Sequence, residues 1–222
     1  MLIKTILIPA FLWSGYSILP TVYYKFIYKE RYQKNELHLT FDDEPNPNYT
    51  EQILDILKQH HTKAIFFVIA EKVEKYPDIL KKIHQEGHDI GLHCYHHTHP
   101  FLWGIWKTKK DMQKSKQILE NHGIKPSYYR PPHGWVNLSM ILISKRWNIP
   151  LKLWTCIVGD WNENKAWKDI YDAMQKEKQK GGVICLHDSN HKPNSPSKAP
   201  ENTISALNEY FKKCGDTNGH KM

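Results

Sequence analysis

The sequence has few cysteines and no paired cysteine motif. Its four cysteines, Cys94, Cys156, Cys185 and Cys214, are widely spaced, and none forms a C-x-x-C pair. This spacing argues against a cysteine-based zinc site. Scattered cysteines of this kind are more often buried small apolar residues than disulfide partners, so their number gives no sign of a strongly oxidising compartment.

The chain also lacks an arginine-rich stripe, an internal repeat and a low-complexity linker. Nucleic acid is therefore not expected as a partner, and no protein partner is predicted. The formal net charge is nevertheless +8, from lysines that are spread along the chain. Such lysines indicate either a solvated surface or attraction to an anionic lipid or wall polymer. A length of 222 residues suits one domain with a short appendage.

Residues 1–28 form a long apolar run in which Lys4 and Lys25 are the only charged side chains. The interval from Thr5 to Tyr24 has the roughly 20 residues that a helix needs to cross a bilayer. No small-residue cleavage site follows it. We therefore predict an uncleaved, single-pass membrane anchor over 1–28. The alternative is an apolar flap that packs on the domain.

From Glu36 onward the sequence alternates between short apolar strands and amphipathic helices. Strands are predicted at 37–41, 64–69, 88–92, 127–130, 151–158 and 183–186, with helices between and after them. Repeated strand-then-helix units predict an α/β fold, with a parallel sheet or barrel and helices outside. We expect one domain over 36–213 and a loose polar tail over 214–222.

Candidate functional side chains fall at the ends of these strands, where β/α folds place their active sites. Asp42 and Asp43 end the first strand; adjacent carboxylates repel, and a bound metal would stabilise them. His93 and His97 stand four residues apart, which lets two imidazoles converge on one ion. With Asp43 they would form an open, three-ligand site. A capping loop and a surface histidine cluster are the alternatives, and His93 with His96 is the poorer pair.

Three further strand ends carry polar residues. The run RPPHG at 130–134 contains two prolines, which stiffen a loop that can hold a guanidinium against a carboxylate and aim a backbone N–H at an oxyanion. Asp160 can orient a histidine, and Trp161 can form the wall of a cleft. His187 is a candidate general acid, because the pKa of histidine lies near neutrality. A plain turn and structural side chains are the alternative interpretations.

The runs TFDD, H-x-x-x-H, RPPxG, DW and LHD occur in this order between Glu36 and Phe211. In this the sequence resembles the polysaccharide deacetylases of carbohydrate esterase family 4, which carry the NodB homology domain. The resemblance implies a distorted (β/α) barrel, preceded here by the N-terminal membrane helix. It also implies metal-dependent hydrolysis of N-acetyl groups on peptidoglycan or chitin-like sugars, giving free amine and acetate.

The resemblance further implies three groups of site residues. The catalytic group is Asp42 as general base with Arg130 to position it, and His187 as general acid with Asp160 to tune it. The metal group is Asp43, His93 and His97, around one divalent ion, usually zinc. The substrate group is His133, whose backbone N–H would help bind the oxyanion, with Trp161 and Leu186 in the acetyl pocket.

Three positions depart from the family pattern. Glu44 stands where the family has glycine, Cys94 replaces a serine or threonine, and His133 replaces an aromatic residue. All expected ligands and both acid–base residues remain, so we predict activity with an altered substrate preference or rate. The alternatives are a metal amidohydrolase for a small non-sugar amide and a non-catalytic, membrane-tethered glycan-binding protein.

The expected substrate and the flanking charges disagree about the side of the membrane. A wall-polymer substrate places the catalytic domain outside the cytoplasm, and this is our prediction. Lys29, Arg31 and Lys34, however, follow the apolar run. The positive-inside rule would place the same domain in the cytoplasm.

Overall fold

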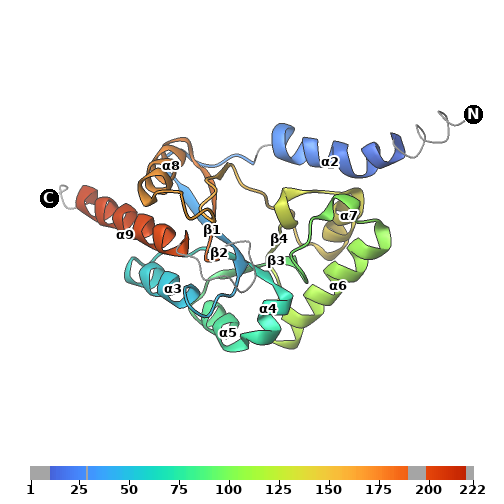
Figure 1. The fold of residues 1–222 in the computed structure, drawn as a ribbon, viewed down its shortest axis with the longest axis horizontal. Coiled ribbons are helices and arrows are strands. Elements are labelled where there is room, and N and C mark those ends of the chain that lie inside the picture. The colour runs from blue at the N-terminus through green and yellow to red at the C-terminus, as the bar shows by residue number, and fades with distance from the viewer. Residues whose placement is uncertain (1–10, 29, 190–198, 219–222) are drawn as a thin grey trace, which may run out of the picture.

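The computed structural model describes residues 11–28, 30–189 and 199–218, with side chains to residue 213 (Figure 1). Within these residues six strands form one parallel sheet in the order β4-β3-β2-β1-β6-β5. The strands are β1 (Leu37–Glu44), β2 (Ile65–Ile69), β3 (Asp89–Cys94), β4 (Tyr128–Tyr129), β5 (Cys156–Ile157) and β6 (Gly182–His187). The predicted parallel α/β fold is therefore confirmed.

Helices surround the strands, as the strand-then-helix order requires. They are α3 (Thr50–Gln59), α4 (Ala70–Lys75), α5 (Pro77–Gln85), α6 (Ile105–Asn121), α7 (Leu138–Trp147), α8 (Trp167–Lys180) and α9 (Ala199–Asn218), with short 3-10 turns η3 (Pro100–Leu102) and η4 (Pro132–Gly134). In Figure 1, α8 and α9 lie to one side of the strands, α6 and α7 to the other, and α3 to α5 along the lower edge.

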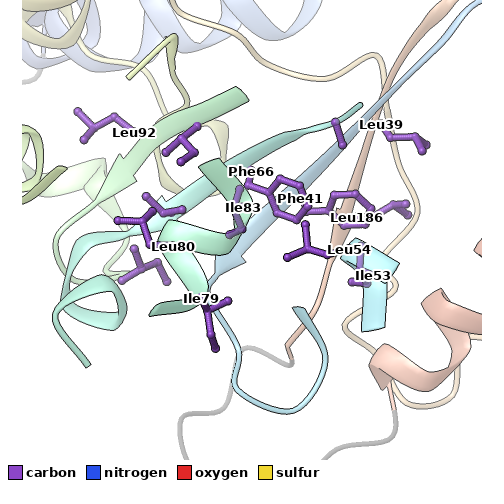
Figure 2. Packing of buried hydrophobic residues seen from close by; sticks show 14 of the residues in the cluster. Leu39, Phe41, Ile53, Leu54, Phe66, Ile79, Leu80, Ile83, Leu92 and Leu186 are labelled. Atoms are coloured by element: carbon purple, nitrogen blue, oxygen red, sulfur yellow. The ribbon is translucent and has the colours of Figure 1, made fainter. Parts of the chain in front are cut away.

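A layer of large apolar side chains holds β1 against its neighbours. Phe41 stacks on Phe66 of β2 with ring centroids 5.1 Å apart. Leu186 of β6 and Leu54 of α3 are also fully buried and belong to the same cluster, as Figure 2 shows. Burying one such side chain contributes about 1.5–3 kcal/mol. This layer therefore fixes the strands that carry the polar residues at their ends.

The segment 150–157 joins the two edges of the sheet. At one end, the Tyr129 N–H donates to the Pro150 carbonyl oxygen and the Lys152 N–H donates to the Tyr129 carbonyl oxygen, both at 2.9 Å. At the other end, β5 pairs with β6. The sheet is thus curled toward a distorted barrel. The predicted strand over 151–158 is shortened to two residues because the segment bonds to two different strands in turn.

The last helix extends beyond the predicted end of the domain. The sequence predicts a loose tail over 214–222, whereas α9 runs to Asn218. Extending a helix that is already formed costs little, because each added residue gains one hydrogen bond. Residues 219–222 lie outside the described residues.

Residues 11–27 form a helix that lies along the top of the body in Figure 1. After an α-helical start at residues 11–13, it consists of α2 (Leu19–Val22) between two π-helical turns, η1 (Ser14–Ile18) and η2 (Tyr23–Ile27). Among the described residues, no helix combines the length and apolar character that crossing a bilayer requires. The first part of the predicted anchor, residues 1–10, lies outside the described residues.

This N-terminal helix contacts the body through polar side chains. The Thr21 hydroxyl donates to the Val136 carbonyl oxygen at 2.8 Å and accepts from the Val136 N–H at 2.9 Å. The Trp135 indole N–H donates to the Ser17 hydroxyl at 2.7 Å. Ser17 and Thr21 are buried. The described part of the predicted anchor is therefore packed on the body, as in the flap alternative.

Candidate active site

A β-bulge brings Asp42 and Asp43 to the same site. Neighbouring side chains of a regular strand point to opposite faces. Here the register with β2 shifts between Asp42 and Glu44, and Asp43 has a left-handed backbone φ of 74°. The Lys72 ammonium donates to the Asp43 carbonyl oxygen at 2.5 Å. The bulge re-aims the second carboxylate, so both lie at the carboxyl end of β1.

Asp43, His93 and His97 lie close enough to share one ion. Asp43 Oδ1 is 3.5 Å from His93 Nε2 and 3.3 Å from His97 Nε2. His93 Nδ1 lies 2.6 Å from the Arg130 carbonyl oxygen. Since a carbonyl only accepts, Nδ1 carries the proton and Nε2 keeps its lone pair for a ligand. One carboxylate oxygen and two imidazole nitrogens match the donor set of an open zinc site, so these residues fit a divalent ion.

His96 points away from this cluster. Its Nδ1 lies 2.7 Å from Glu71 Oε2, and its side chain is 49% exposed. β3 ends at Cys94, and the turn that follows directs His96 to the surface and His97 back toward Asp43. The converging pair is therefore His93 with His97 and not His93 with His96.

The guanidinium of Arg130 fixes the Asp42 carboxylate. Nη1 donates to Asp42 Oδ1 at 2.6 Å and to the Thr40 hydroxyl at 2.8 Å. Nε and Nη2 donate to the carbonyl oxygens of Lys152 and Leu153 at 2.9 and 3.0 Å. Arg130 is fully buried. A guanidinium held from three sides cannot swing, so it keeps the carboxylate in one orientation.

Asp160 holds His187 at two points. One carboxylate oxygen lies 2.9 Å from His187 Nδ1, and the other accepts the His187 backbone N–H at 2.7 Å and the Thr203 hydroxyl at 3.0 Å. Burial disfavours the imidazolium, but the carboxylates of Asp160, Asp43 and Asp42 together outweigh burial and raise the pKa of His187 to about 9. The ring is therefore charged at neutral pH, with Nε2 on the side away from Asp160.

A pocket of about 260 Å³ connects these groups. It is lined by Lys25, Asp42, His93, His97, His133, Trp154, Ile157, Trp161 and His187. The Trp161 ring stands edge-on to the His187 ring at 4.9 Å, and the His133 ring lies 4.6 Å from the His97 ring. One carboxylate, four imidazoles and two indoles thus face the same pocket.

Three of the lining residues were not predicted from the sequence. Trp154 and Ile157 lie on the segment 150–157, whose irregular path has no periodic pattern to indicate it. Lys25 comes from the N-terminal helix, and its Nζ donates to the His133 carbonyl oxygen at 2.9 Å. The available signal for Lys25 was that it is one of only two charged side chains in the apolar run.

Leu186 lies in the core and not in the pocket. Side chains alternate along β6, so Leu186 points to the face opposite that of Cys185 and His187. It is fully buried in the apolar cluster, and its Cα partner on β1 is Phe41. The expected place of Leu186 in the acetyl pocket is corrected for this reason.

Glu44 is fully buried beside the bulge. Neither of its carboxyl oxygens has a hydrogen-bond partner within the described residues. Burial, followed by the carboxylates of Asp188, Asp42 and Asp43, raises the pKa of Glu44 well above its usual range. The side chain therefore favours its neutral acid, and the departure from glycine adds a carboxyl group without requiring a buried charge.

The described cysteines are not paired. Cys94, Cys156 and Cys185 are free thiols, and Cys94 and Cys185 are buried. The expectation of buried, unpaired cysteines is confirmed for these two. The side chain of Cys214 lies outside the described residues.

The chain matches the sequence profile of the polysaccharide deacetylase family over residues 29–152. It is 36% identical over 165 residues to a peptidoglycan N-acetylglucosamine deacetylase of Bacillus cereus, a match that covers 74% of this chain and 60% of the relative. It is 33% identical over 153 residues to a peptidoglycan N-acetylmuramic acid deacetylase of Bacillus subtilis, covering 68% of this chain and 32% of the relative.

The fold is similar to that of a peptidoglycan N-acetylglucosamine deacetylase whose crystal structure holds 4-naphthalen-1-yl-N-oxidanyl-benzamide. The TM-score is 0.75 at 29% sequence identity, and the match covers 85% of each chain.

Proposed function

The chain belongs to the polysaccharide deacetylase family, and on this basis we propose that it is a metal-dependent N-deacetylase. It hydrolyses a carbon–nitrogen bond other than a peptide bond, in the acetamido group of an N-acetylated amino-sugar polymer. The substrate is peptidoglycan or a chitin-like oligosaccharide, and the products are the free amine and acetate. The activities named for the two Bacillus relatives support peptidoglycan.

The observation that carries the proposal is that one pocket of about 260 Å³ is lined by members of the catalytic, metal and substrate groups of residues. Asp43, His93 and His97 would hold the ion, with zinc as the expected metal because of the oxygen and nitrogen donors. When bound, such an ion supplies positive charge to the acetyl oxygen and to the attacking water.

The protein residues then divide the proton transfers between them. Asp42, held by Arg130, accepts a proton from the attacking water. The His133 backbone N–H donates to the oxyanion that develops on the acetyl carbonyl. His187 Nε2 gives its proton to the sugar nitrogen as the carbon–nitrogen bond breaks, and Asp160 stabilises the charged ring until then. Trp161 covers the pocket beside His187.

Acetate release tests the proposal. Purified full-length chain with zinc is incubated with N-acetylglucosamine oligomers and with peptidoglycan, and acetate is measured. Release from either polymer is the expected result. Release from small non-sugar amides alone would favour an amidohydrolase. Glycan binding without release, unaltered by Asp42→Asn, would favour a non-catalytic binding protein.

We further propose that the N-terminal helix brings the enzyme to a membrane, with the catalytic domain outside the cytoplasm. The proposal is supported by the apolar outer side of this helix, where Phe11, Leu12, Leu19, Phe26 and Ile27 are between 61% and 80% exposed. Such a face suits a helix lying in a lipid surface. The full chain should sediment with phospholipid vesicles, and Phe26→Asp should weaken this. A chain that stays in the supernatant would contradict membrane contact.

A further inference from the structure

Three polar side chains form a stripe along the side of the N-terminal helix that faces the body. Ser17, Thr21 and Lys25 are spaced four residues apart, so they lie on one side of the helix. Ser17 and Thr21 are buried, although they belong to an otherwise apolar run. Burying a polar group costs free energy unless the group has a hydrogen-bond partner. The stripe therefore indicates a specific polar partner on the body.

The partner is the loop 133–136, which carries the proposed oxyanion donor. The Ser17 hydroxyl accepts the Trp135 indole N–H at 2.7 Å. The Thr21 hydroxyl accepts the Val136 N–H at 2.9 Å and donates to the Val136 carbonyl oxygen at 2.8 Å. Three hydrogen bonds thus fix the helix to the end of this loop, and two of them use the loop backbone.

Lys25 extends the contact to the catalytic part of the loop. Its Nζ donates to the His133 carbonyl oxygen at 2.9 Å, and its Cε lies 3.0 Å from the position that a Cβ would take on Gly134. His133 and Gly134 have left-handed backbone φ angles of 55° and 62°. A residue with a side chain rarely keeps that conformation unless surrounding contacts hold it there. Lys25 supplies one such contact, because it fixes the direction of the His133 carbonyl.

We propose that Lys25 is a positioning residue, which holds the His133 backbone in the orientation that lets its N–H donate to the oxyanion. The two peptide planes of His133 meet at its Cα, so a carbonyl held in one direction restricts the N–H as well. Ser17 and Thr21 keep the helix, and with it Lys25, on the loop. All three residues precede residue 29, where the match to the family profile begins. The proposal rests on the proposed deacetylase function and adds that the N-terminal helix is part of the active site.

The rate constants of acetate release test the positioning role. The full chain with zinc is assayed on the N-acetylglucosamine pentasaccharide. Lys25→Met should lower kcat about threefold to tenfold, as expected for one lost hydrogen bond, with KM nearly unchanged because the oxyanion forms only in the transition state. Lys25→Arg keeps a donor and should restore most of kcat. Lys34→Met is the matched control, since Lys34 is an exposed lysine outside the helix. An unchanged kcat in Lys25→Met, or a rise in KM alone, would overturn the proposal.

Amide hydrogen exchange, followed by NMR, separates this proposal from the chemistry. The Gly134 N–H donates to the Pro131 carbonyl oxygen at 3.0 Å, so its exchange reports on the loop itself. Exchange at Gly134 should become at least about threefold faster in Lys25→Met and keep the parent rate in Lys34→Met. Faster exchange in a chain that never releases acetate would support the contact and reject the proposed function alone. Equal exchange in both variants would reject the positioning role, whatever the activity.

Discussion

Asp42 of β1 and His187 of β6 are register partners on adjacent parallel strands. Their side chains therefore leave the same face of the sheet. An oxygen of Asp42 and a ring nitrogen of His187 lie within 4.8 Å of each other and of Cys185 Sγ. Each of the two is held by a group of opposite charge, Asp42 by Arg130 and His187 by Asp160. The pairing of β1 with β6 therefore places a carboxylate and an imidazole next to each other in the lining of one pocket.

The first prediction concerns the alkaline pH limit. The pKa of His187 is raised to about 9, so the ring holds its proton below that pH and loses it as the pH rises further. As a general acid it should fail above about pH 9. Asp160→Asn removes the largest of the negative charges that raise this pKa while burial still lowers it, so the alkaline limb of kcat/KM should move to lower pH. An alkaline limb at the same pH in parent and variant would mean that Asp160 does not set the pKa of the general acid.

The second prediction compares two histidines of one loop. His97→Ala should lower bound zinc at least about tenfold, because it removes one of three converging ligands. His96→Ala should leave zinc content unchanged, since His96 faces Glu71 at the surface. Zinc bound after equilibrium dialysis is the measurement. Equal zinc loss in both variants would mean that a surface histidine cluster binds the metal.

The third prediction concerns Leu186 and the core. Leu186→Ala should lower the free energy of unfolding by about 2–5 kcal/mol, because the side chain is fully buried. Ile157→Ala is the control: Ile157 lines the catalytic pocket and is 40% exposed, so the loss should stay near 0.5 kcal/mol. Urea denaturation measures both. Equal stability losses would argue that Leu186 is not a core residue.

The fourth prediction concerns Glu44 in the metal-free chain. Its pKa is raised by burial, so the folded state binds a proton that the unfolded state releases at lower pH. Stability must then fall as pH rises from the ordinary glutamate range toward the raised value. Glu44→Gln is neutral at every pH and should flatten this fall. Urea titrations from acid to neutral pH compare the two slopes, and parallel slopes would show that Glu44 is already charged.

Much of the strand and helix order could be predicted because apolar periodicity reports it directly. The strand predicted over 64–69 matches β2 to within one residue, whereas β5 keeps two residues of a predicted eight-residue strand. The difference arises because the segment 150–157 pairs with β4 and β6 in turn. Tertiary pairing of that kind leaves no local pattern.

The ligand and acid–base residues could be proposed from motif order, and the structure brings them together around one pocket. Their roles stay predictions until they are measured. The place of Leu186 could not be read from its motif, because alternation along β6 assigns neighbours to opposite faces. The role of Lys25 could not be predicted, because the apolar run around it predicts lipid contact. In the structure its charged side chain lines the catalytic pocket.

Asp42→Asn tests the central claim most directly, with acetate release and zinc content measured on the same samples. The full chain should release acetate from the N-acetylglucosamine pentasaccharide or from peptidoglycan. The variant should release acetate about 10²–10⁴-fold more slowly, as expected when a general base is removed. It should bind as much zinc as the parent and unfold at the same thermal midpoint. A zinc-loaded chain that releases no acetate from any N-acetylated glycan, or a variant as fast as the parent, would contradict the account.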